Sequence, residues 1–105
     1  MLLIESDAGV RHILTRVLTR AGLRVCYPSQ YGGALPPADT IVAETMEPGA
    51  WPYDELLAAA ASGSHIIILG HCPVGFATRR VLCMEKLDAV RELPVAIRRS
   101  WEQPR

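Results

Sequence analysis

The stretch that decides the fold is Asp39-Thr40-Ile41-Val42-Ala43-Glu44-Thr45-Met46-Glu47-Pro48-Gly49. Its small and β-branched residues, 40–43, predict a short buried strand, and the proline and glycine at 48 and 49 predict a turn after it. The strand carries one carboxylate, Glu44, at its carboxyl end. In an open parallel sheet, ligands and reacting groups gather at the carboxyl ends of the strands, so Glu44 is the first candidate site residue.

Other apolar runs predict strands on both sides of this one, at Leu2–Ile4, His65–Leu69 and Val81–Met84. His65–Leu69 is apolar on both faces and therefore belongs near the centre of a parallel sheet. A further, more exposed strand is predicted at residues 23–27, where Pro28 ends it. The chain is therefore expected to form a five-stranded sheet.

Helical spacing predicts three helices between these strands. The first follows Asp7, a suitable N-cap, and ends at Gly22. The second covers residues 53–62. The last is predicted to begin near Glu92, because Pro94 is best tolerated in a first turn, with a kinked helix that starts earlier as the alternative. Residues 29–37 are crowded with glycine and proline, and few residues separate the last two strands. The helices after the second and fourth strands are therefore expected to be shortened or missing.

This element order predicts one α/β domain over residues 1–105, a flavodoxin-like three-layer sandwich with the strand order 2-1-3-4-5. The formal net charge of +0 and the pI of about 6.8 exclude a general attraction to nucleic acid or to an anionic membrane. The apolar runs are too short to cross a bilayer, and the acidic start lacks the features of a secretory signal.

Three cysteines, Cys26, Cys72 and Cys83, are odd in number and lack the paired spacing of a metal site. We expect them to be small core residues of a cytoplasmic protein, with Cys72, in the loop after the fourth strand, as the one that could instead be exposed and reactive. His65 and His71 add no short spacing to them, so zinc is not expected.

Motifs along the whole chain point to a family. The carboxylates Glu5 and Asp7 stand on either side of Ser6 after the first strand, Glu44 ends the third strand ahead of a Met-x-Pro-Gly turn, and Lys86 follows the fifth strand. In this order the chain resembles the receiver domain of bacterial two-component response regulators, as a degenerate or pseudo-receiver member. The resemblance implies a place in signal transduction.

Receivers hold a divalent cation between an acidic pair and the phospho-accepting aspartate, because phosphoryl transfer needs charge neutralisation around an oxygen-rich site. In this chain the acidic pair is represented by Glu5 and Ser6, so one carboxylate is missing, and Asp7 follows them. The acceptor position is occupied by Glu44. Its extra methylene displaces the carboxylate by more than about 1 Å, and misplacement on that scale can cost orders of magnitude in rate.

The remaining family positions also differ. Gly70 stands where a receiver carries its switch hydroxyl, and Leu87 replaces the proline that usually follows the lysine, so a cis bond is not expected there. Lys86 alone is retained. Glu44 can then be either a fixed mimic of a phosphorylated side chain or an inert carboxylate held by an ion pair with Lys86. The inert interpretation is favoured, since a carboxylate has less charge and fewer acceptor atoms than an acyl phosphate.

The resulting hypothesis is an atypical signalling domain that works by protein–protein interaction without phosphorylation, and that is not an enzyme and needs no cofactor or metal. Its expected partner is a protein of a signalling pathway, with a homodimer as an alternative and with no direct binding of nucleic acid or membrane. One alternative is a metal-dependent, phospho-accepting receiver that uses Glu5, Asp7 and Glu44. Another is a nucleotide or small-ligand module, although residues 6–9 are acidic where a glycine-rich phosphate loop would lie.

Two surface features complete the candidates. Trp51 lies in the loop after Glu44, where an aromatic side chain could anchor a partner or pack the loop. A basic group is formed at the end of the chain by Arg98, Arg99 and Arg105 with Trp101, joined by Arg79 and Arg80. Such a group is usually a solvated helix end.

Overall fold

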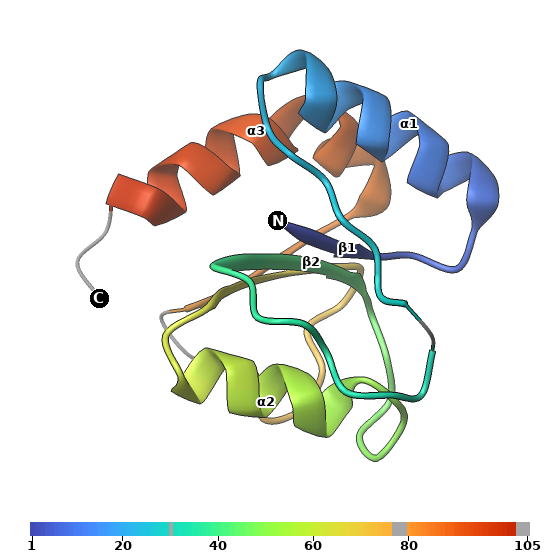
Figure 1. The fold of residues 1–105 in the computed structure, drawn as a ribbon, viewed down its shortest axis with the longest axis vertical. Helices are drawn as coiled ribbons and strands as arrows, with labels where there is room; N and C mark the ends of the chain where they lie inside the picture. The colour runs from blue at the N-terminus through green and yellow to red at the C-terminus, as the bar shows by residue number, and fades with distance from the viewer. Residues whose placement is uncertain (30, 77–79, 103–105) are drawn as a thin grey trace.

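The computed structural model describes residues 1–29, 31–76 and 80–102. Its four strands form one parallel sheet in the order β1-β2-β3-β4. The strands are β1 (Leu2–Ile4), β2 (Thr40–Glu44), β3 (His65–Leu69) and β4 (Val81–Met84), and the helices are α1 (Ala8–Arg20), α2 (Tyr53–Ala61) and α3 (Lys86–Glu102) (Figure 1).

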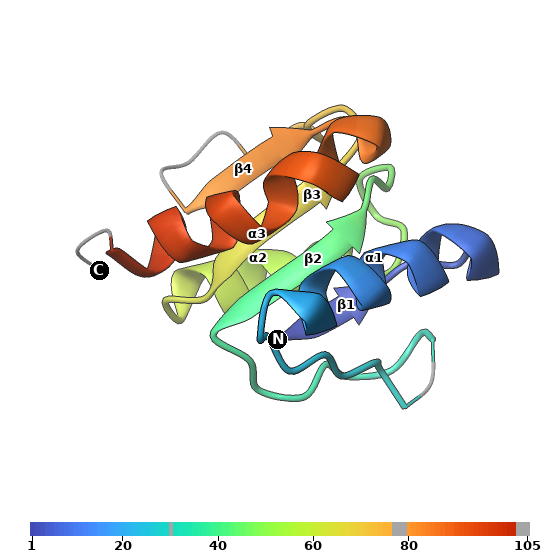
Figure 2. The same cartoon turned by 90° about the horizontal axis from the view of Figure 1, so that it is seen from above.

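The elements are arranged in three layers. Helices α1 and α3 pack against each other and cover one face of the sheet, while α2 covers the other face (Figures 1 and 2). This layering, with a parallel sheet in the middle, is compatible with a flavodoxin-like fold. Within the described ranges, no helix has the length and apolarity needed to cross a membrane.

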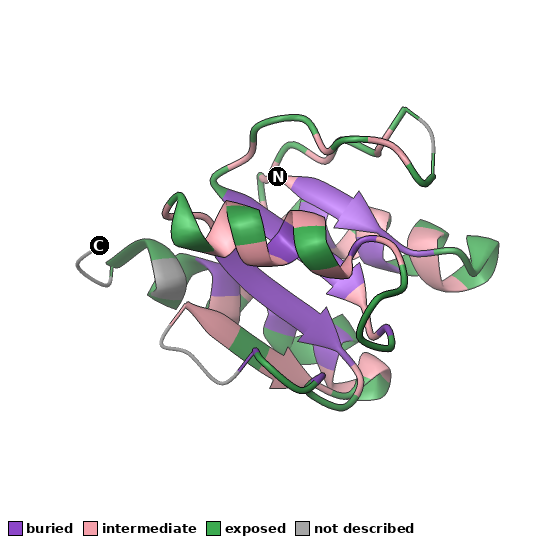
Figure 3. Ribbon diagram, turned by 90° about the horizontal axis from the view of Figure 1, so that it is seen from below, coloured by how far each residue is buried: buried purple, intermediate pink, exposed green. Residues whose placement is uncertain are grey.

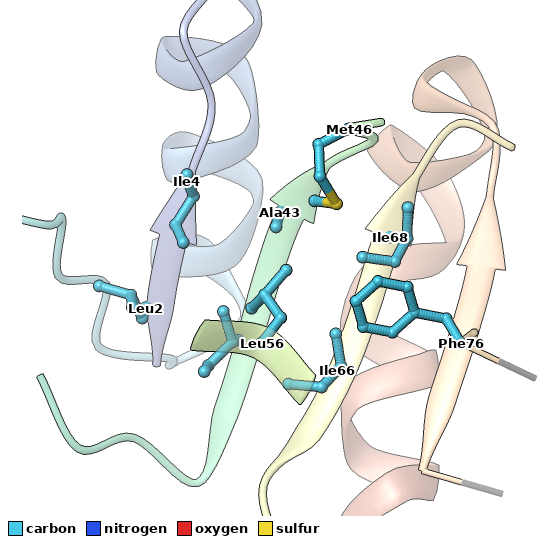
Figure 4. Packing of buried hydrophobic residues seen from close by; sticks show 9 residues of the cluster. Leu2, Ile4, Ala43, Met46, Leu56, Ile66, Ile68 and Phe76 are labelled. Atoms are coloured by element: carbon cyan, nitrogen blue, oxygen red, sulfur yellow. The ribbon is translucent and has the colours of Figure 1, made fainter. Parts of the chain in front are cut away.

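Alternation along the strands builds two apolar layers, one on each face of the sheet. Under α1 and α3, the layer is made by Leu3, Leu14, Leu18, Val42, Ile67, Leu69, Ala89, Leu93 and Ile97. Under α2, it is made by Leu2, Ile4, Ile41, Ala43, Met46, Leu56, Ile66, Ile68 and Phe76 (Figure 4). The strands β1, β2 and β3 are buried along almost their whole length, as the purple arrows of Figure 3 show.

The ends of α1 follow from local chemistry. Asp7 is the N-cap, and its side chain accepts a hydrogen bond from the backbone N–H of Val10 at 3.0 Å. Gly22 follows the helix with a φ of +86°, a conformation that suits glycine, and Leu23 N–H bonds back to the carbonyl of Leu18. Both predicted helix boundaries are confirmed.

The prediction of a five-stranded sheet is wrong. Residues 23–27 make a single parallel bridge, between Cys26 and Leu2, on the free side of β1. Pro28 and the glycine- and proline-rich segment that follows restrict the backbone and leave no length for a ladder. The four remaining strands keep the neighbours that the predicted order gave them. In the described residues, no helix lies between Cys26 and β2 or between β3 and β4.

The predicted start of the last helix near Glu92 is also wrong, and the alternative of an earlier start is confirmed, because α3 begins at Lys86 and contains Pro94 in its interior. A proline inside a helix costs about 3 kcal/mol, since it removes one backbone hydrogen bond and crowds the preceding turn. Burial of Leu93 and Ile97 against the sheet contributes about 1.5–3 kcal/mol per side chain and offsets that cost. Val90, on the same helix, is 39% exposed.

Two of the three cysteines are not core residues. Cys26 and Cys72 are exposed and Cys83 is half-buried, and all three are free thiols. Cys26 lies on the outer side of β1, and Cys72 lies in the loop after β3, so neither position is covered by a helix. The expectation of small buried cysteines was based on residue type, which does not decide burial in a loop.

Candidate functional site

The candidate site lies at the carboxyl edge of the sheet, where β1 and β2 end and α3 begins. Glu5 follows β1, Glu44 is the last residue of β2, and Lys86 is the first residue of α3. Because Ile4 pairs with Ala43 in parallel register, Glu5 and Glu44 leave the sheet side by side. The arrowheads of β1 and β2 point toward this edge in Figure 2. Together with Ser6, which bonds Glu44, the structure brings together four of the predicted site residues.

Glu5 is the buried centre of this cluster. Its side chain is 0% exposed, and its Oε1 lies 2.9 Å from the Nζ of Lys86. The backbone N–H of Asp7 donates a hydrogen bond of 3.1 Å to Oε2. The closest partner of Lys86 is thus Glu5, and its distance to Glu44 Oε2 is longer, at 3.8 Å. The expected ion pair of Lys86 with Glu44 is the weaker of the two.

Glu44 is held mainly by Ser6. The backbone N–H of Ser6 donates to Glu44 Oε1 at 2.9 Å, and the Ser6 hydroxyl donates to Oε2 at 3.1 Å. Ser6 occupies a position at which a second carboxylate would repel Glu44. Its hydroxyl instead donates to Oε2, and together with its backbone N–H at Oε1 it fixes both oxygens of the longer glutamate side chain.

Burial and hydrogen bonding shift the pKa values of this cluster in opposite directions. Desolvation raises the pKa of Glu5 above 4.5, although the bond from Lys86 opposes the shift. Burial also acts to raise the pKa of Glu44, but the neighbouring Glu5 carboxyl, which can donate to Glu44 once it is protonated, outweighs burial together with the Ser6 hydrogen bonds and the Lys86 charge, and the pKa is lowered below 4.5. The hydrogen bond to Glu5 raises the pKa of Lys86 above 10.5. Glu44 and Lys86 are therefore charged at neutral pH, and Glu5 is the group that takes up a proton first on acidification.

The side chain of Asp7 caps α1, and only its backbone N–H contacts the cluster. Its Oδ1 accepts the Val10 N–H, and this backbone hydrogen bond is the main reason that its pKa is lowered. Among the residues described, no three His, Cys, Asp or Glu side chains are placed to hold a metal ion together. Glu5 is paired with a lysine and Glu44 is bonded by Ser6, so these residues do not fit a divalent cation, which needs several free oxygen ligands.

Gly70 is required by its own backbone and by a neighbour. Its φ is +123°, and a Cβ added there would lie 2.9 Å from the Cγ2 of Thr45. Thr45 itself is fixed, because its hydroxyl donates to the carbonyl of His71 at 2.8 Å. The space into which a side chain at position 70 would extend is thus filled by Thr45. Leu87 lies in the first turn of α3 and is 89% exposed.

Two aromatic residues beside the cluster were not predicted as part of it. The Tyr31 hydroxyl and the Arg11 guanidinium both donate to the backbone carbonyl of Glu5, at 3.0 and 3.2 Å. The ring of Tyr31 lies 5.0 Å from that of Trp51, whose indole N–H donates to the Gly33 carbonyl at 2.7 Å. Trp51 therefore packs the loops of its own chain. The tyrosine within a glycine-rich loop was the one signal in the sequence for this contact.

The other sequence candidates lie apart from the cluster. Trp101 is half exposed, and its indole N–H donates to the Thr40 hydroxyl at 3.0 Å. Arg98 donates to the Ala21 carbonyl at 3.2 Å. Arg79 and Arg105 lie outside the described residues. Of the described members of the proposed basic group, Arg98 and Trp101 therefore bond the end of α1 and the start of β2 and not the carboxylates.

Comparisons with protein-family models, with curated proteins and with solved structures give no match for this chain.

Proposed function

We propose that the chain is a receiver-like, phosphorylation-independent domain that acts by binding a protein partner in cytoplasmic signalling. The basis is the resemblance of its sequence to response-regulator receivers, together with a carboxylate cluster whose oxygens are bonded by Ser6, Asp7 and Lys86. The flavodoxin-like scaffold of a receiver is kept in this proposal, with the second strand reduced to the bridge at Cys26.

The observation that carries the proposal is the double hydrogen bond from Ser6 to Glu44. A phospho-accepting carboxylate needs one free oxygen as nucleophile and a cation to neutralise the phosphoryl group. Here both oxygens of Glu44 accept from Ser6, and the nearby positive charge of Lys86 is paired with Glu5. Glu44 is therefore best suited to a structural role that joins the ends of β1 and β2.

A second argument concerns switching. Receivers transmit phosphorylation through a hydroxyl that moves toward the phosphoryl group, and this chain has Gly70 at that position. The contact of a Cβ at position 70 with Thr45 and the positive φ both oppose a side chain there. A domain without this hydroxyl is expected to bind its partner in one conformation.

Incubation with a small-molecule phosphodonor and Mg²⁺, followed by intact mass measurement, tests the proposal. The expected result is an unchanged mass for the wild-type chain and for the Glu44→Gln variant. An adduct with the mass of one phosphoryl group on the wild-type chain, absent from Glu44→Gln, would refute it.

The metal-dependent alternative is tested separately, by calorimetric titration with Mg²⁺ or Mn²⁺. We expect no saturable heat at millimolar metal, because Glu5 is paired and Asp7 caps α1. Saturable binding that Glu44→Gln abolishes would favour the alternative.

A further inference from the structure

The sheet has one covered edge and one open edge. On the outer side of β1, Cys26 accepts a hydrogen bond from Leu3 N–H at 2.9 Å and donates one to the Met1 carbonyl at 2.8 Å. Strand β4 forms the opposite edge (Figure 2), and no other segment of residues 1–29, 31–76 or 80–102 pairs with its outer side. An open edge of this kind is a template for another strand.

The hydrogen bonds between β4 and β3 determine which N–H and C=O groups of β4 face away from the sheet. The carbonyls of Arg80 and Met84 accept from Ile66 and Gly70, both at 2.8 Å, so alternate residues of this strand face β3. Val81 and Cys83 alternate with the residues that face β3 and therefore direct their N–H and C=O groups outward. The residues of β4 include no charge and no proline, which are the usual devices that protect an edge.

A groove of about 610 Å³ lies beside this edge, between β4 and α3. Its apolar wall includes Leu82 and Val95, which are 47% and 50% exposed. Leu82 and Val95 therefore leave apolar surface uncovered beside the open strand, which a partner could bury.

The charge of the groove is positive. Three arginines line it, Arg80, Arg91 and Arg99, against one carboxylate, Glu92. Arg91 has a single long contact, of 3.9 Å, with Asp88 on its own helix, and both side chains are largely exposed. An isolated surface pair of this kind is worth little, so Arg91 can turn to another carboxylate at low cost.

We propose that the edge of β4 and this groove bind an extended acidic segment of a partner protein, which adds to the sheet as a fifth strand. The inference rests on the proposed function, because it names the kind of partner that the domain would bind. Strand addition uses the outward N–H and C=O groups of β4 for affinity and the groove for specificity.

The spacing on α3 defines the side chains of that segment. Arg91, Val95 and Arg99 follow one another at four-residue intervals, so the two arginines are about 12 Å apart along the helix axis. Alternate side chains on one face of a strand recur every ~6.6 Å, and two residues four apart are about 13 Å apart. The matching sequence is an acidic residue, any residue, an apolar residue, any residue and a second acidic residue.

A second copy of the chain does not match this chemistry. Antiparallel pairing of β4 with the β4 of another molecule would bring two positively charged grooves together, and like charges at an interface cost affinity. The charge balance therefore selects an acidic partner.

The test uses two labelled peptides, one with Glu-Thr-Val-Thr-Glu at its centre and one with Lys-Thr-Val-Thr-Lys, and measures fluorescence anisotropy with the full chain. We expect the acidic peptide to bind roughly tenfold more tightly or better. The variant with Arg91→Glu and Arg99→Glu should lose this preference and favour the lysine peptide. The variant with Arg16→Glu and Arg20→Glu, which makes the same charge change on exposed residues of α1, should keep the wild-type preference.

Amide hydrogen exchange tests the strand itself. Bound acidic peptide should slow exchange at Val81 and Cys83, whose N–H groups face outward. Equal affinity for the two peptides, an unchanged preference in the Arg91 and Arg99 variant, or unchanged exchange at these two amides would overturn the inference. If the chain sediments as a dimer, loss of that dimer on addition of the acidic peptide would support binding of the peptide in the groove. A dimer that becomes more stable with Arg91→Glu and Arg99→Glu would instead assign the groove to a second copy of the chain.

The outcome is separable from that of the proposed function. Peptide binding that fails while the phosphodonor leaves the mass unchanged overturns only the identity of the partner segment. A phosphoryl adduct on Glu44 overturns the proposed function, whatever the peptides do.

Discussion

Substitution of Lys86 by methionine tests the ion pair between Lys86 and the buried Glu5. Methionine keeps much of the apolar stem of lysine but removes the ammonium group that lies 2.9 Å from Glu5 Oε1. Removing one member of a fully buried ion pair costs about 3–5 kcal/mol, because the other charge stays buried without a partner. Lys86 is 39% exposed, so solvent screening reduces that figure, and we expect a loss of about 2 kcal/mol at pH 8.

The pH dependence of this loss of stability shows whether the charge on Glu5 causes it. Burial already raises the pKa of Glu5 above 4.5, and without the ammonium group the pKa rises further. A carboxyl group whose pKa is raised by folding contributes stability at low pH, and this contribution is lost as the pH rises from 4.5 through the folded-state pKa. The deficit of Lys86→Met should therefore be largest at pH 8 and become smaller toward pH 5.

Urea denaturation followed by far-UV circular dichroism measures both effects. Two controls are provided by the chain. Glu5→Gln combined with Lys86→Met removes both charges and should restore part of the stability at pH 8. Arg91→Met breaks an exposed pair of 3.9 Å and should change the free energy of unfolding by less than about 0.5 kcal/mol. Equal stability of Lys86→Met and wild type at pH 8, or a deficit that is the same at pH 5, would refute the reasoning.

Two further predictions concern neighbouring positions. Gly70→Ser should destabilise the fold by about 2 kcal/mol, because position 70 has a φ of +123° and its Cβ would lie 2.9 Å from Thr45 Cγ2. Thr45→Ala should recover only the steric part of that loss in urea denaturation, and a stable single variant would show that position 70 is free to carry a side chain. Alkylation of the native protein at pH 8 should label the exposed Cys26 and Cys72 quickly and Cys83 slowly, since burial raises the pKa of the Cys83 thiol to about 12. Three labels at equal rates by intact mass would contradict this environment of Cys83.

Much of the scaffold could be predicted from the sequence because its strands are continuous apolar runs. His65–Leu69 and Val81–Met84 have the predicted boundaries, and Thr40–Glu44 extends the prediction by one residue. The grouping of Glu5 and Glu44 followed from parallel strands alone, since both residues stand at carboxyl ends.

The errors have physical causes that local patterns do not contain. Residues 23–27 have the composition of a strand, but the number of bonds they make depends on the restricted segment after Pro28. The start of α3 was misplaced because propensity penalises Pro94, whereas tertiary burial of Leu93 and Ile97 stabilises the longer helix. Lys86 pairs with Glu5 and not mainly with Glu44 because its two distances differ by about an ångström, and residue spacing in the sequence cannot predict such a difference.

The groove beside β4 could not be predicted from local sequence patterns either. Its arginines come from the residue before β4 and from α3, and they converge only after the sheet is formed. The regular spacing of Arg91, Val95 and Arg99 gained a meaning only when α3 was found to begin before them.

The central claim is that Glu44 is a fixed structural carboxylate in a domain that does not respond to phosphorylation. An amide correlation spectrum of the ¹⁵N-labelled chain, recorded before and after addition of Mg²⁺ and a small-molecule phosphodonor, tests it most directly. The account predicts that the signals of Ser6, Glu44 and Gly70 stay in place, because Ser6 already holds both oxygens of Glu44. A new set of signals at these three residues, appearing only with phosphodonor and metal together, would contradict the account.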